Sequence, residues 1–139
     1  MKVLFVCRGN VGRSQMASGL FTKYTGIKAY SAGIKVFENE NQKLKEIPLA
    51  EPAIRFMKRE GLDIAENFRK QLTPNMFEQF DKIIVMSEPD TIPEYLLQNK
   101  KVEFWEIQDP KGVDDKEYEK IIFQIKDKIK KFIKSNKLK

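Results

Sequence analysis

The sequence of 139 residues contains no histidine and only one cysteine, Cys7. A single cysteine excludes an intramolecular disulfide and any metal site built from several cysteines. The absence of histidine excludes Ser-His-Asp triads and Cys-His pairs, and it argues against a zinc site. If the chain is an enzyme, its chemistry depends on cysteine, carboxylates, arginine, lysine and backbone dipoles. We therefore expect neither a bound metal nor a cofactor.

Long apolar runs are also missing, since no stretch is long enough to cross a bilayer. The first residues, "MKVLFV", are too short for a signal peptide and precede no cleavage site of small residues. With 41% hydrophobic and 33% charged residues, the composition is that of an ordinary soluble protein. We expect one domain over residues 1–139, located in the cytoplasm and without a membrane partner.

Positive charge is in excess, with a formal net charge of +6, and part of it lies in the C-terminal segment "KDKIKKFIKSNKLK". Such a segment is either a nucleic-acid or membrane patch or the solvated face of a helix. Apolar residues recur at helical spacing, which favours the helix face: Ile121, Ile125, Ile129, Phe132 and Ile133. No basic patch with interleaved aromatics and no zinc-finger spacing indicates a nucleic-acid partner. The net charge favours small anionic partners.

Short β-like runs alternate with helical stretches along the chain. The predicted strands are 2–6, 28–32, 82–86 and 102–107, and the predicted helices are 14–26, 52–61, 73–80 and 115–135. Ser14 and Thr73 are the expected N-caps of the helices 14–26 and 73–80, and Gly26 and Gly61 are expected where the helices 14–26 and 52–61 end. This alternation predicts an α/β domain with a parallel sheet covered by helices on both faces. The polar segment 34–51 is expected to be a long loop over the site.

Two chemically active residues follow predicted strands. Cys7 comes directly after the first strand, and Asp109 directly after the fourth. Ligands of parallel sheets bind beyond the carboxyl ends of the strands. We therefore expect Cys7 and Asp109 to lie at the same edge of the sheet.

The segment "CRGNVGRS" from Cys7 to Ser14 has the features of an anion-binding loop between a strand and a helix. Glycine and asparagine admit backbone conformations closed to other residues, so the amides can converge on one point near the helix N-terminus. The planar guanidinium of Arg13 can bind two oxygens of a tetrahedral oxyanion. The same field would stabilise a thiolate at Cys7, helped by a hydrogen bond from Ser14. The loop residues are Arg8, Gly9, Asn10, Val11, Gly12, Arg13 and Ser14.

Simpler interpretations exist for both signals. A lone cysteine after a buried strand is usually a small core residue, and an Asp-Pro pair is usually a turn former. The glycines, the arginine and the following helix favour a functional Cys7. Pro110 holds Asp109 in extended geometry, where its carboxylate is free to protonate a leaving oxygen as a general acid.

The chain resembles the low-molecular-weight protein tyrosine phosphatase family, which includes the thioredoxin-coupled arsenate reductases. The resemblance covers nearly the whole chain and rests on "VLFVCRGNVGRSQMASG", "SAG" at 31–33, "GLDIAENFRKQLT" at 61–73, "DKIIVMSEPD" at 81–90 and "DPKG" at 109–112. It implies a four-stranded parallel sheet with a phosphate-binding loop after the first strand. It also implies attack of Cys7 on phosphorus, phosphate binding by Arg13, and acid and base roles for Asp109. In that pattern Asn10 holds the loop shape and Ser14 assists the thiolate.

The chain departs from the family pattern at several positions. Many family phosphatases have a second cysteine where this chain has Gly12, and eukaryotic members have a tyrosine pair where Lys111 and Gly112 stand here. The loop after "SAG" lacks an obvious aromatic wall, although Phe37 is a candidate. The arsenate reductases of the family also use further cysteines, which are absent here.

Three functions remain open at this point. The first is a hydrolase of phosphotyrosine proteins or small aryl phosphates, with inorganic phosphate and other tetrahedral oxyanions as further ligands. The second is an arsenate reductase that takes electrons from an external small thiol. The third is a phospho-ligand binding protein without turnover, although binding alone needs no Asp109.

Overall fold

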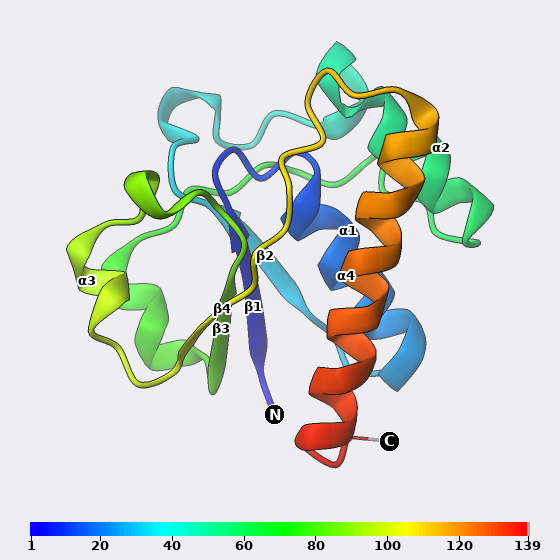
Figure 1. The fold of residues 1–139 in the computed structure, drawn as a ribbon. Coiled ribbons are helices and arrows are strands. Elements are labelled where there is room, and N and C mark those ends of the chain that lie inside the picture. The colour runs from blue at the N-terminus through cyan, green and yellow to red at the C-terminus, as the bar shows by residue number, and fades with distance from the viewer. Residues whose placement is uncertain (139) are drawn as a thin grey trace.

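Four parallel strands form the centre of the computed structural model, which describes residues 1–138. They are β1 (Val3–Cys7), β2 (Tyr30–Gly33), β3 (Lys82–Val85) and β4 (Val102–Phe104), in the order β2-β1-β3-β4 (Figure 1). Every neighbouring pair is parallel. The predicted parallel sheet is therefore confirmed. The fourth strand is shorter than predicted and ends at Phe104 instead of residue 107.

The central strand β1 separates two apolar cores because its side chains alternate between the faces of the sheet. Val3 and Phe5 belong to the core beneath α1 (Arg13–Thr25), α2 (Glu51–Arg59) and α4 (Asp115–Ser135). Leu4 and Val6 belong to a second core on the opposite face. That face is covered by α3 (Glu94–Leu97) and the 3₁₀ helix Pro74–Gln79 (Figure 1). The predicted helical cover on both faces is thus confirmed.

The predicted helix cap at Ser14 is wrong, whereas Thr73 lies at the predicted N-cap position but makes no capping bond. The N-cap of α1 is Gly12, which makes no side-chain capping bond, and Ser14 lies inside the helix. The hydroxyl of Thr73 pairs with the Asn75 side chain instead of capping the backbone, and the segment that follows is a 3₁₀ helix. The glycine termination of α1 is confirmed, since Gly26 has a φ of 75° and its N–H bonds to the carbonyl of Thr22.

The C-terminal helix α4 matches the predicted range, 115–135. Its N-cap Asp114 accepts a hydrogen bond from the amide of Glu117 at 2.9 Å. The five apolar residues singled out in the sequence belong to this helix, and all of them are buried. The lysine-rich segment is therefore in large part the outer face of an amphipathic helix. Within residues 1–138, no helix is both long and apolar enough to cross a membrane.

The segment 34–51 contains three single-turn 3₁₀ helices, Phe37–Asn39, Leu44–Glu46 and Pro48–Ala50. Two of its side chains, Lys35 and Leu49, line the pocket at the carboxyl edge of the sheet. The prediction of a loop over the site is confirmed in this respect.

Gly33 ends β2 directly against the Cys7–Ser14 loop. A Cβ at this position would lie 2.8 Å from the backbone nitrogen of Asn10 and 2.9 Å from the carbonyl carbon of Gly9. Such contacts are too short for any side chain, so glycine is required for β2 to pack here. The "SAG" segment thus supports the loop from one side.

Candidate active site

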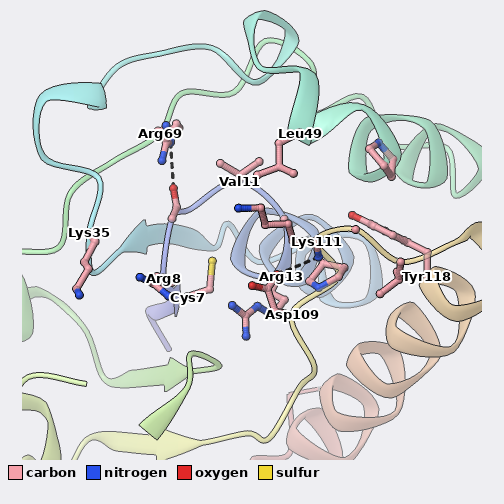
Figure 2. Close-up of a pocket in the computed structure, with 16 residues that line it drawn as sticks. Cys7, Arg8, Val11, Arg13, Lys35, Leu49, Arg69, Asp109, Lys111 and Tyr118 are labelled. Atoms are coloured by element: carbon pink, nitrogen blue, oxygen red, sulfur yellow. Dashed lines mark hydrogen bonds between the residues drawn. The ribbon is translucent and has the colours of Figure 1, made fainter. Parts of the chain in front are cut away.

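A pocket of about 380 Å³ opens at the carboxyl ends of the strands. It brings together the three residues that the sequence analysis placed in the chemistry, Cys7, Arg13 and Asp109 (Figure 2). One expectation about their placement is wrong. Because β4 ends at Phe104, Asp109 stands on the loop that follows the strand and not at its end. The loop nevertheless returns Asp109 to the edge where β1 delivers Cys7.

The backbone of the loop is shaped by Asn10. Its φ of 56° lies in the left-handed region, which asparagine tolerates better than most residues. Gly9 and Gly12 do not have positive φ, so within the loop Asn10 alone takes the left-handed conformation. Both glycines line the pocket, and a side chain on Gly12 would extend toward Pro110 and Tyr118.

The amide of Asn10 links the loop shape to the thiol. Its Oδ1 accepts a hydrogen bond from the backbone N–H of Lys70 at 2.8 Å, which fixes the orientation of the amide group. Its Nδ2 therefore faces Ser14 and donates to the Ser14 Oγ at 2.7 Å. The hydroxyl hydrogen of Ser14 is then free to point at the Cys7 Sγ, 3.0 Å away. This arrangement leaves the Ser14 hydroxyl as a hydrogen-bond donor to the Cys7 sulfur.

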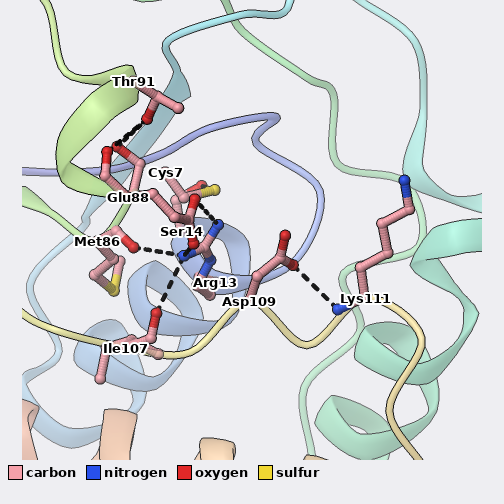
Figure 3. Close-up of polar contacts among 10 residues, drawn as sticks. Cys7, Arg13, Ser14, Met86, Glu88, Thr91, Ile107, Asp109 and Lys111 are labelled. Carbon is pink, nitrogen blue, oxygen red and sulfur yellow. Dashed lines mark hydrogen bonds and ion pairs between the residues drawn. The ribbon is translucent and has the colours of Figure 1, made fainter.

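Arg13 is only 4% exposed, and its guanidinium is held along one edge (Figure 3). Nη1 donates to the carbonyls of Met86 at 2.6 Å and Ile107 at 3.1 Å. It also bonds to the Glu88 carboxylate at 2.9 Å. Nε has no protein acceptor among residues 1–138, and the side chain lines the pocket. Nη2 donates one hydrogen to the other oxygen of the Glu88 carboxylate at 3.4 Å. Nε and the second Nη2 hydrogen are thus available for two oxygens of an oxyanion.

Glu88 is a site residue that the sequence analysis missed. Partial burial acts to raise the pKa of its carboxyl, but hydrogen bonds from Arg13 and from its own backbone, with the charges of Arg13 and Arg8, outweigh burial and lower it. Glu88 follows β3 as Asp109 follows β4. The rule that ligands bind beyond the carboxyl ends of parallel strands therefore applied to Glu88 as well. Glu88 fixes the guanidinium and offsets part of its buried charge.

Asp109 forms a turn with the residue two places on. Its Oδ1 accepts a hydrogen bond from the backbone N–H of Lys111 at 3.0 Å, and the side chain is exposed to solvent (Figure 3). Its negative charge acts on Tyr118. The pKa of Tyr118 is raised mainly by burial and further by this carboxylate. Asp109 thus lies at the pocket with one oxygen available to a bound molecule.

The walls of the pocket differ from the sequence-based expectation. Phe37 is 60% exposed and does not line the pocket, so its suggested role as an aromatic wall is wrong. Leu49 takes that place, together with Val11, Pro110 and Tyr118. The Tyr118 ring is itself fixed by stacking on Phe56, with centroids 5.1 Å apart.

A second network behind the loop also escaped sequence reasoning. The Gln15 amide donates to the carbonyl oxygen and Oδ1 of Asn10, each at 3.2 Å, and its Oε1 accepts from Asn67 at 3.1 Å. Arg69 donates from Nε to the Gly9 carbonyl at 3.0 Å. These residues stand in stretches that carry the family resemblance, but only the fold brings 67–70 beside the loop. Within residues 1–138, no cluster of three or more potential metal ligands is present.

Comparisons of the sequence and of the fold both find phosphatases and arsenate reductases. The family model for low molecular weight phosphotyrosine protein phosphatases matches residues 2–139. Arsenate reductase 2 of Staphylococcus haemolyticus is 32% identical over 133 residues, which are 94% of each chain. The low molecular weight protein tyrosine phosphatase of T. tengcongensis superposes with a TM-score of 0.78 at 28% identity, over 97% of this chain and 99% of that one. Vibrio vulnificus Wzb, solved with benzylphosphonate, shares the fold at 22% identity, with a TM-score of 0.79 over 96% and 97% of the two chains.

The ion pair between Glu88 and Arg13 leads to a prediction about stability. Glu88→Ala leaves a buried guanidinium with only its carbonyl partners, so the free energy of unfolding should fall by about 1–2 kcal/mol, since Glu88 is itself partly exposed. Saturating inorganic phosphate should then stabilise the variant more than the wild type, because the anion replaces the lost carboxylate. Thermal unfolding with and without phosphate measures both effects.

The matched control is Asp90→Ala, which removes an exposed carboxylate nearby that has no contact with Arg13. It should unfold as the wild type does. Equal stability and equal phosphate shifts in Glu88→Ala and the wild type would show that Glu88 does not hold Arg13.

Proposed function

Because the chain belongs to the low molecular weight phosphotyrosine protein phosphatase family, we propose that it hydrolyses phosphomonoesters, with phosphotyrosine or a small aryl phosphate as substrate. The observation that carries this proposal is the contact of the Cys7 Sγ with the Ser14 Oγ at 3.0 Å, made in the pocket that Arg13 also lines. A hydrogen-bonded sulfur in this pocket supports a role for Cys7 as the attacking group. A binding protein would need the loop and Arg13 but no nucleophile.

In the first step the Cys7 thiolate attacks phosphorus, and the bond from phosphorus to the leaving oxygen breaks. The loop amides and the Nε–Nη2 edge of Arg13 bind the equatorial oxygens, which carry the charge of the transition state. Asp109 in its protonated form gives its proton to the leaving oxygen, so the alcohol or phenol departs neutral. The product on the protein is a phosphoryl group on Cys7.

In the second step a water molecule attacks the same phosphorus. Asp109, now a carboxylate, accepts a proton from this water, and the bond between sulfur and phosphorus breaks. Inorganic phosphate leaves, and Cys7 returns as a thiolate that Ser14 stabilises. Asp109 is suited to both roles because it is exposed and uses only one oxygen in the turn to Lys111.

The similarity to arsenate reductases favours a second candidate function. Arsenate would condense with Cys7 to a sulfur–arsenic adduct with loss of water. A small thiol would then attack the Cys7 sulfur, which releases arsenite and leaves a mixed disulfide on Cys7. A second thiol would restore Cys7 and depart as the oxidised small disulfide, so two external thiols supply the two electrons. External thiols are needed because Cys7 is the single cysteine.

Cys7→Ser tests the nucleophile directly. The variant should lose hydrolysis of p-nitrophenyl phosphate, because a serine hydroxyl has no base beside it to activate it. It should still bind inorganic phosphate in calorimetry, since the loop amides and Arg13 remain. Turnover in the serine variant comparable with the wild type would exclude Cys7 as nucleophile. Arsenate reduction with a small thiol, combined with no phosphatase activity in the wild type, would favour the second candidate.

Asp109→Asn tests the general acid through the leaving group. The amide cannot donate a proton to the leaving oxygen as an acid does, so the rate should fall by about 10²–10⁴-fold for alkyl and unactivated aryl phosphates. The loss should be smaller for p-nitrophenyl phosphate, whose leaving group needs less help. Asp90→Asn is the control and should match the wild type. An equal loss for every leaving group would assign Asp109 a positioning role instead.

A further inference from the structure

The mouth of the pocket has two chemically different sides (Figure 2). Leu49, Pro110 and Tyr118 form an apolar side. Across the pocket from them lie the side chains of Arg8, Lys35 and Arg69, which we call the basic side. A substrate bound through its phosphoryl group at Cys7 would have both sides within reach of its leaving group.

Two residues of the basic side are hydrogen-bonded to backbone carbonyls of the Cys7–Ser14 loop. The N–H of Lys35 donates to the carbonyl of Arg8 at 2.8 Å, and the Nε of Arg69 donates to the carbonyl of Gly9 at 3.0 Å. Arg8 is itself a loop residue. Lys35 and Arg69, from two distant segments, are thus hydrogen-bonded to the loop that carries Arg8. The fold therefore sets where these three residues lie relative to Cys7.

The cations of the basic side are in contact with no carboxylate of the described residues, although the charge of Arg8 helps to lower the pKa of Glu88. Arg8, Lys35 and Arg69 make no ion pair with a carboxylate of residues 1–138, although other cations such as Lys43 and Arg55 do. The nearby Glu88 is engaged with Arg13. Lys35 and Arg8 are exposed, so both can reach a bound molecule.

A single phosphoryl group does not account for these cations. The loop amides and Arg13 already provide its donors, and they lie deeper in the pocket. Resting on the proposed function, we propose that the basic side binds a second anionic group carried by the leaving-group part of the substrate. The substrates are then phosphomonoesters with a carboxylate or a further phosphate beyond the hydrolysed one, while the apolar side contacts an uncharged part such as an aromatic ring.

A matched pair of substrates isolates the second charge. N-acetylphosphotyrosine and its carboxamide have the same phenol as leaving group and differ by one carboxylate. For the wild type, kcat/KM should be about three- to tenfold higher for the acid, as expected for contacts with two partly exposed cations. The ratio should decrease as the salt concentration rises.

The double variant Arg8→Gln/Lys35→Gln should bring this ratio close to one. Lys128→Gln, which removes an exposed lysine of α4, is the control and should keep the ratio of the wild type. Equal kcat/KM for acid and amide in the wild type would exclude small anionic phosphates as the source of the second charge. A double variant that loses the same factor for both substrates would overturn the proposal, because the cations would then act only on the phosphoryl group.

Phosphotyrosine peptides with Glu or Gln beside the phosphorylated residue form a second arm. A preference for the Glu peptides that the double variant loses, without a preference between the two small molecules, would identify acidic peptides as the source of the second charge. A preference between the small molecules alone would identify small anionic phosphates. The absence of both preferences would contradict the proposal.

Binding to Cys7→Ser separates this proposal from the proposed function. Calorimetry with N-acetylphosphotyrosine and its carboxamide needs no turnover, and the acid should bind about three- to tenfold more tightly. A binding preference in a protein whose wild type hydrolyses no phosphomonoester would support the basic side and reject the hydrolase. Hydrolysis without a preference for the acid or for the Glu peptides would do the reverse.

Discussion

The hydrogen bond that Asn10 donates to Ser14 connects the shape of the loop to the state of its sulfur. The backbone N–H of Lys70 fixes the asparagine amide, the amide fixes the serine hydroxyl, and the hydroxyl faces the Cys7 Sγ. Each of these groups is buried or belongs to a loop held against β2, so the arrangement exists before any ligand arrives. Such preorganisation means that little rearrangement is needed when charge develops on a bound oxyanion.

Arg13 is buried, and its guanidinium is still able to bind an oxyanion. Nη1 of Arg13 is saturated by two carbonyls and by Glu88, which offset the cost of burying the charge. Nη2 also donates one hydrogen to Glu88, while Nε and the second Nη2 hydrogen stay free. The contacts that orient the guanidinium therefore do not compete with the anion for the same hydrogen atoms. This division of one side chain into a structural edge and a binding edge depends on the carboxyl ends of β3 and β4 meeting at the same place as that of β1.

Much of this could be predicted from the sequence, and the failures are informative. The hydrophobic periodicity of the sequence predicted all four strands and the helix over 115–135. It did so because regularly spaced apolar residues mark the side of an element that is buried. The strand-then-loop position of Cys7 located the site. Ser14 is not an N-cap, and Thr73 occupies its N-cap position without a capping bond. The reason is that a hydroxyl near a helix start has other partners once the chain is folded, here Cys7 and Asn75. The apolar wall at Leu49 and the cation at Arg69 come from segments distant in sequence, and no local pattern marks such contacts.

The most direct measurement of the proposed chemistry is the mass of the protein quenched in acid within the first turnovers of a phosphomonoester substrate. A covalent mechanism predicts a phosphoryl group on the peptide that contains Cys7, formed and lost at rates compatible with turnover. Substrate hydrolysis that proceeds without any phosphorylated Cys7, or with the phosphoryl group on another residue, would contradict it.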